Sequence, residues 1–322
     1  MPPTRSRTTS SGERAASSGQ RADSSGDRAD LSWGVTTGFI SLGGDTGRPG
    51  QGDPGGTLID THCHLDVTAF DADRHQVLAQ ARSAGVSRLV IPAIHAAGWP
   101  GLLDLCEREE GLYPALGLHP VYLNQHQPGD LQALSRLLKA RRPLAVGEIG
   151  LDYFIPDLDR LGQEALFEGQ LRLAADAQLP VLIHARKSHD QVLVCLKRHP
   201  VQGGIIHAFN GSLQQAYRYL DLGFKLGFGG MLTFDRARHL RSLAAALPVT
   251  ALVLETDAPD LTVAAHQGER NSPAYLPDVL TALAEIRGLD ARELALQTSL
   301  NAMDVLDFAS WKAVRNEPAD PN

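Results

Sequence analysis

The sequence lacks the features that would place the chain in a membrane or in an oxidising compartment. No apolar run approaches the roughly 20 residues needed to span a bilayer, and the N-terminus is polar where a secretory signal needs an apolar stretch. The three cysteines, Cys63, Cys106 and Cys195, form no CxxC pair, which argues against a disulfide framework and a cysteine-built zinc site. We therefore expect a cytoplasmic protein with no membrane partner and no obligatory protein partner.

Basic charge is also scarce. The formal net charge is −7 at pH 7, whereas proteins that coat nucleic acid non-specifically neutralise phosphates with Lys and Arg. The negative net charge argues against a protein of this kind. It still allows a local basic rim around an acidic pocket that holds cations.

Two segments show almost no apolar periodicity. Residues 1–56 are rich in Ser, Gly, Arg and Ala, so they cannot bury enough surface to offset the entropy of ordering. We expect a disordered extension there and a loose polar tail over residues 311–322. Residues 57–310 form the predicted folded domain, and a hydrophobic content of 43% is enough to supply its core.

Eight short apolar or β-branched runs recur within this domain. They read TLID, RLVIP, YPALG, LAVGEI, PVLIH, GGIIH, FKLGFGG and ALVLETD, and each precedes a stretch with helical apolar spacing, such as residues 165–178. Eight strands alternating with helices over about 250 residues predict an α/β fold of the (β/α)₈ TIM-barrel class. A doubly wound sheet is the alternative, but its first strand is more usually followed by a Gly-rich phosphate loop, where this chain reads DTHCHLD.

Residues suited to bind metal ions follow the predicted strands. They are His62 and His64 after the first strand, Glu148 at the end of the fourth, His184 of the fifth, His207 of the sixth, and Asp257 after the eighth. The carboxyl ends of barrel strands meet at one mouth, and strand alternation places His62 and His64 on the same side. One histidine at a strand end is more often an ordinary hydrogen-bond partner, but six such residues together favour a site for Zn²⁺, Mn²⁺ or a similar ion.

Seven motifs occur in order along the predicted domain: IDTHCHLD, ALGLHP, AVGEIGLDY, PVLIHAR, HAFNGS, KLGFGG and LVLETDAPDL. Together they make residues 57–310 resemble the TatD family of metal-dependent deoxyribonucleases, in the amidohydrolase superfamily. The resemblance implies a barrel that hydrolyses DNA phosphodiesters, as a 3′-5′ exonuclease, with two or three divalent ions, Zn, Mn or Mg. Its metal ligands match the set named above: His62, His64, Glu148, His184, His207 and Asp257.

Two departures from the family pattern concern substrate choice. The chain reads HAFNG where many members have H(C/G)FSG, so Ala208 and Asn210 differ, although Asn210 keeps hydrogen-bonding capacity for a substrate. Residues 259–277 are also longer and more polar than in many relatives. Loops at this face of a barrel set specificity, so we expect differences from the family there.

Phosphodiester hydrolysis requires charge shielding and a supply of hydroxide at neutral pH. Metal ions provide both, since they lower the pKa of bound water from 15.7 to about 7. Our hypothesis is that a water held between two metals bridged by Glu148 attacks phosphorus while Asp257 accepts its proton. Asp257 as a plain ligand is the alternative, and the two roles are compatible.

Donors for the phosphate are expected near the metals. Arg186 alternates to the side of His184 and offers a planar fork, and His119 and Arg270 follow the third and eighth strands. The alternatives are an outer partner of a metal ligand for His119 and surface charge for Arg270. Asp152 is expected to orient a ligating histidine or to cap the following helix, and Glu255 is expected to contact the ligating residues rather than the metals.

Two further functions use the same residues. A deacylase or amidohydrolase acting on a small ester or amide fits the scaffold, but many such enzymes have a carbamylated lysine where this chain has Glu148. A protein that holds metal only for structure is disfavoured, because structural zinc sites are closed and four-coordinate. Six candidate ligands at an open barrel mouth leave room for water and substrate.

Overall fold

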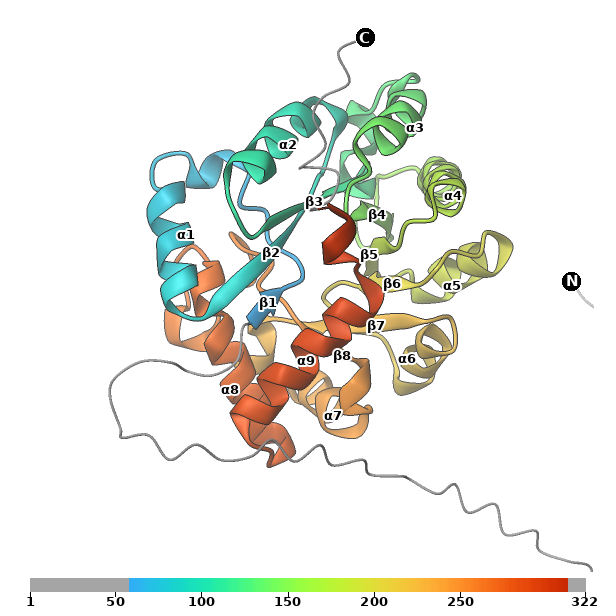
Figure 1. The fold of residues 1–322 in the computed structure, drawn as a ribbon. Coiled ribbons are helices and arrows are strands. Elements are labelled where there is room, and N and C mark those ends of the chain that lie inside the picture. The colour runs from blue at the N-terminus through green and yellow to red at the C-terminus, as the bar shows by residue number, and fades with distance from the viewer. Residues whose placement is uncertain (1–57, 312–322) are drawn as a thin grey trace, which may run out of the picture. The chain divides into compact units, whose positions relative to one another are not determined.

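The computed structural model describes residues 58–311 as an eight-stranded parallel sheet in the order β1 to β8, with helices around the outside (Figure 1). All eight strands lie where the sequence predicts them, and the fold class is confirmed. The strands are β1 (Leu58–Asp60), β2 (Val86–Pro92), β3 (Leu112–Leu116), β4 (Ala145–Asp152), β5 (Val181–Arg186), β6 (Gly204–Ile206), β7 (Phe224–Phe228) and β8 (Leu252–Leu254).

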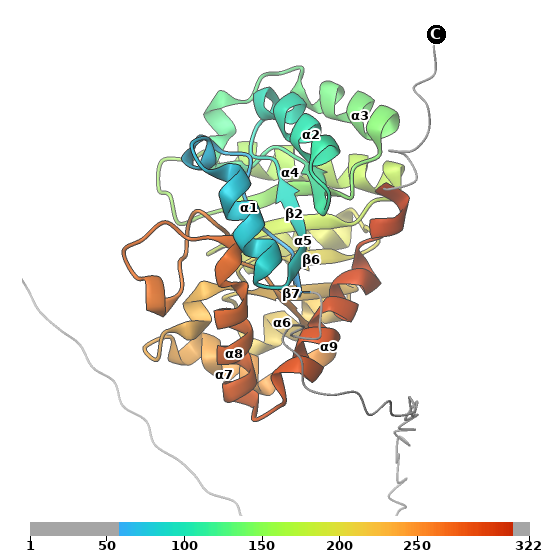
Figure 2. The same ribbon diagram turned by 60° about the vertical axis from the view of Figure 1, so that its left-hand side comes forward.

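Nine α-helices occur within residues 58–311. They are α1 (Arg74–Ser83), α2 (Trp99–Arg108), α3 (Asp130–Arg141), α4 (Arg160–Ala177), α5 (His189–Arg198), α6 (Leu213–Leu220), α7 (Arg238–Ala246), α8 (Leu276–Arg287) and α9 (Ala291–Val305). Helices α1 to α8 surround the strands, whereas α9 runs across them in contact with β1, β7 and β8 (Figure 1 and Figure 2). None of these helices is long and apolar enough to cross a membrane. The extension expected over residues 1–56 and the tail expected after Ser310 lie outside the described residues, except for Trp311, which is buried in the core.

The sequence of each strand reflects burial on both faces. All residues of β3 and β4 are buried, because one face points into the barrel and the other meets the helices. Parallel strands in this position read as continuous rather than alternating apolar runs. Helix ends follow local signals: Ser212 and Gln215 form a capping box at the start of α6, and α8 ends where Gly288 adopts a left-handed conformation.

A buried carboxylate joins the first and last strands of the barrel. The Oδ1 atom of Asp60 accepts from the backbone N–H groups of His62 and Thr256, and its Oδ2 atom accepts from the Thr256 hydroxyl at 2.6 Å. Beside it, the Thr61 N–H donates to the carbonyl of Leu254 at 3.0 Å. These bonds connect β1 to β8 directly below the residues that follow both strands. We call them the β1–β8 seam.

The substitution Thr256→Val tests the seam. It removes the only side-chain donor to Asp60 within the described residues and leaves a buried carboxylate oxygen unpaired, so we expect a loss of about 1–3 kcal/mol in the free energy of unfolding. Urea denaturation would measure it. The exposed helical Thr281→Val is the matched control, expected to change stability by less than about 0.5 kcal/mol. Equal stability of the two variants would contradict the assignment.

Candidate metal centre

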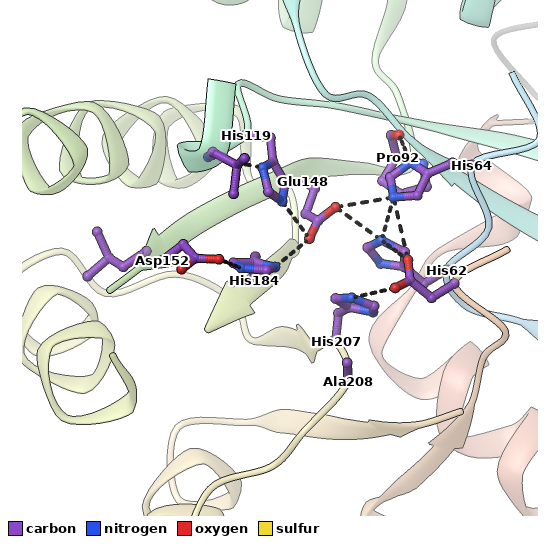
Figure 3. Close-up of polar contacts among 12 residues, drawn as sticks. His62, His64, Pro92, His119, Glu148, Asp152, His184, His207 and Ala208 are labelled. Carbon is purple, nitrogen blue, oxygen red and sulfur yellow. Dashed lines mark hydrogen bonds and ion pairs between the residues drawn. The ribbon is translucent and has the colours of Figure 1, made fainter. Parts of the chain in front are cut away.

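The Glu148 carboxylate lies at the centre of the polar cluster in the barrel mouth (Figure 3). It is 2% exposed and contacts four histidines. Its Oε1 atom is 3.2 Å from His119 Nε2 and 3.2 Å from His184 Nδ1. Its Oε2 atom is 3.1 Å from His62 Nε2 and 3.4 Å from His64 Nε2. Both oxygens of one side chain therefore face imidazole nitrogens from β5 and from the segments after β1 and β3.

Asp257 supplies a second carboxylate on the other side of this cluster. Its Oδ1 atom is 3.8 Å from His62 Nε2 and 3.6 Å from His64 Nε2, while its Oδ2 atom is 3.6 Å from His207 Nε2. The backbone of Asp257 is left-handed, with φ of 58°, which is costly for a residue with a Cβ atom. Its N–H donates to the carbonyl of His62 at 2.8 Å, so the β1 end holds Asp257 in this conformation.

Three overlapping groups of side chains can each hold a metal ion, with potential ligand atoms within 4.8 Å of one another. Glu148 and His62 each belong to two of them. The groups are His62 with His207 and Asp257, His62 with His64 and Glu148, and His119 with Glu148 and His184. This buried nitrogen and oxygen set suits divalent transition ions. The fit is supported by the Nε2 atoms of His62 and His64, which lie 3.2 Å apart, close enough for one cation to be bound by both nitrogens.

Outer contacts orient the histidine rings. His184 Nε2 is 3.0 Å from Asp152 Oδ2, His207 Nδ1 is 3.1 Å from Glu255 Oε1, and His64 Nδ1 is 3.1 Å from the carbonyl of Pro92. Partners of this kind fix the orientation of ligating histidines and tune their basicity. The contacts expected from the sequence for Asp152 and Glu255 are thus present.

The protonation of the cluster reflects its crowded charges. Burial alone would raise the pKa of the Glu148 carboxyl, but His119 and His62 outweigh burial and hold that pKa well below its ordinary value. Burial opposes a charge on His64, yet Glu148 raises the His64 pKa to about 9. Burial also opposes a charge on His207, yet Glu255 and Asp257 raise its pKa to about 10. Without a metal ion, these protons supply the positive charge that the carboxylates require.

The pKa values of two further cluster members, His62 and Asp257, move in opposite directions. Burial and the neighbouring His207 lower the pKa of His62 well below its ordinary value, so this imidazole is neutral and able to bind a cation. Burial raises the pKa of Asp257 to about 6, close to the range in which a carboxylate exchanges protons at neutral pH.

The four residues expected to bind substrate have four different surroundings in the structure. His119 lies inside the cluster, in contact with Glu148. The guanidinium of Arg186 lies 3.8 Å from the centroid of the Phe154 ring, and both side chains are exposed. Arg270 donates two hydrogen bonds to Asp73, at 3.0 and 2.6 Å, so in this structure it braces the loops after β1 and β8.

Asn210 contacts His189, a buried residue for which the sequence predicts no role. Its Oδ1 atom is 3.1 Å from Nε2 of the buried His189, whose Nδ1 atom is 3.1 Å from the Tyr219 hydroxyl. His189 is the first residue of α5, with no motif around it that predicts a role. Only the fold brings it below Asn210.

A barrel whose mouth gathers histidines and buried carboxylates in this way defines a metal-dependent hydrolase, and the sequence comparisons agree. The family described as TatD related DNase matches residues 59–307. This chain belongs to that family.

Individual relatives span the same part of the chain. The uncharacterized metal-dependent hydrolase YjjV of Escherichia coli (strain K12) is 44% identical over 76% of this chain and 95% of its own length. The 3′-5′ ssDNA/RNA exonuclease TatD of Klebsiella pneumoniae (strain 342) is 33% identical, again over 76% of this chain and 95% of its own. The crystal structure of YjjV superposes with a TM-score of 0.75 at 41% identity, covering 78% of this chain and 98% of that one.

Metal affinity should rise steeply with pH. Because raised pKa values leave His64 and His207 protonated at neutral pH without metal, and a ligating imidazole must be neutral, binding releases protons. We expect Zn²⁺ affinity to increase about tenfold per pH unit for each proton released, from pH 6 to pH 8. Calorimetric titration in buffers of different ionisation enthalpy counts the protons. His75→Gln, at a 91% exposed side chain, should keep the same slope; an affinity independent of pH would refute this reading.

Proposed function

We propose that this metal-dependent hydrolase is a deoxyribonuclease of the 3′-5′ exonuclease type that acts in the cytoplasm. The observation that carries the proposal is the position of Glu148, shared by two groups of potential ligands at an open barrel mouth. Two-metal sites of this kind are common in nucleases and phosphatases. Relatives from Klebsiella pneumoniae and Salmonella typhimurium that carry the name 3′-5′ ssDNA/RNA exonuclease TatD, each 33% identical, support the same substrate.

In this proposal the cluster holds two or three divalent ions, Zn, Mn or Mg. When bound, such ions neutralise charge on the phosphate and lower the pKa of water. The proposed ligands are His62, His64, Glu148, His184, His207 and Asp257. Asp257 is also the proposed proton acceptor, because it is 15% exposed at the mouth whereas Glu148 is enclosed by imidazoles.

We propose that four side chains around the cluster contact the phosphate of the substrate. Arg186 ends β5 two residues after His184, and its stacking on Phe154 fixes a planar fork suited to phosphate oxygens. Asn210 offers amide N–H groups. His119 lies beside the proposed phosphate position, in contact with Glu148. For Arg270 to bind substrate, its ion pair with Asp73 must first open.

A cleavage assay tests the reaction. End-labelled single- and double-stranded DNA is incubated with Mg²⁺, Mn²⁺ or Zn²⁺, beside an EDTA control. We expect metal-dependent shortening from the 3′ end, and a loss of at least about 10³-fold in the Glu148→Gln variant, because the shared carboxylate charge is removed. If folded, metal-loaded protein leaves DNA intact, the nuclease proposal is wrong. A small ester or amide is then the substrate to test.

Asp257→Asn separates the two roles of Asp257. The substitution keeps the shape of the side chain but removes the proton acceptor, so we expect a loss of about 10²–10⁴-fold in kcat at full metal content. Metal content is measured by elemental analysis of the same preparation. The exposed Asp176→Asn is the matched control and should retain both metal and turnover. Loss of metal together with turnover would assign Asp257 as a ligand and remove the support for proton transfer.

A further inference from the structure

A cavity of about 710 Å³ lies beside the polar cluster. Its lining includes His207 and Asp257 of the cluster and also Arg236 and Arg238, so it reaches from the barrel mouth to the first turn of α7. Much of the remaining lining is apolar, with Phe209, Phe228, Met231 and Leu240. The volume falls in the range of roughly 300–1,000 Å³ that is typical of small-molecule sites.

The charges of this cavity are divided by strand. The acids in its lining, Glu255, Asp257 and Asp260, come from the β8 end and the segment after it. The arginines in its lining come from β5, from the segment between β7 and α7, and from the first turn of α7. Arg236 and Arg238 are exposed, have no ion-pair partner among residues 58–311, and meet no acidic side chain in the first turn of α7. They form a basic rim on a protein with a net charge of −7.

The amide of Asn210 adds directed donors to the same wall. His189 Nε2 lies 3.1 Å from Asn210 Oδ1, and His189 Nδ1 lies 3.1 Å from the oxygen of the Tyr219 hydroxyl, which donates to the His189 carbonyl at 3.2 Å. Since the oxygen of Asn210 is occupied, the nitrogen Nδ2 is left facing solvent, with no hydrogen-bond partner in the described part of the chain. Asn210 lines the cavity. It therefore has two N–H groups free to bind a ligand, and donors of this kind are what an anion requires.

We propose that Asn210 and Arg238 form a binding site for a second phosphate, one nucleoside away from the phosphate that reacts at the cluster. The apolar middle of the cavity accommodates the nucleoside, and the donors at its far side bind the next phosphate. The inference rests on the proposed function, because it takes the cluster as the place of the first phosphate. It makes the preferred substrate a nucleotide with phosphates on both sides of the sugar.

Equilibrium binding tests the site without turnover. Metal-loaded wild-type protein is titrated calorimetrically with thymidine 5′-monophosphate and with thymidine 3′,5′-bisphosphate. We expect the bisphosphate to bind about 10- to 100-fold more tightly, the effect of charge-assisted hydrogen bonds from one more phosphate. In Arg238→Gln and in Asn210→Leu this ratio should fall to within about threefold of unity.

Arg136→Gln is the matched control, since it removes one exposed positive charge from the outer helix α3. It should leave the ratio unchanged, and an equal fall would show long-range attraction and overturn the site. Equal affinity of wild-type protein for both ligands, or no binding of either, would also overturn it. Failure of the proposed function looks different: DNA stays uncleaved while the preference for the bisphosphate persists, which assigns the site to another phosphorylated substrate.

Discussion

The arrangement of the barrel mouth depends on one buried carboxylate. Glu148 is almost wholly removed from solvent, and an isolated charge in such a place would cost several kcal/mol. Four imidazoles therefore have to reach it, from β5 and from the segments after β1 and β3. These contacts hold the ends of the strands in fixed positions relative to one another. A cluster with this much negative charge is stable only with protons or cations between its members.

The residues proposed to bind substrate lie around this cluster and are held by contacts of their own. Arg186 is placed by stacking on Phe154, Asn210 by the buried His189, and Arg270 is held by Asp73. None of these three contacts involves the residues around Glu148. Loops can thus change what the barrel mouth binds without disturbing the charges at its centre, as the segments of a barrel generally allow.

The fold and the core of the site could be predicted from sequence because their signals are local. Each strand is a short apolar run, and alternation alone places His62 and His64 on one side. Other contacts have no local signal. His119 lies after β3 in a segment without periodicity, and its approach to Glu148 depends on how that segment turns. The partner of Arg270 is Asp73, 197 positions away, and no pattern in one sequence connects the two.

The β1–β8 seam affects how the chain folds during its synthesis. Asp60 accepts hydrogen bonds from Thr256, 196 positions away in the sequence. The ring can therefore close only after the last strand has formed. Long-range closure of this kind slows folding. During synthesis, the histidines after β1 emerge from the ribosome long before Asp257. A nascent chain that ends before β8 therefore lacks both the hydrogen bonds that close the ring and the Asp257 carboxylate of the cluster.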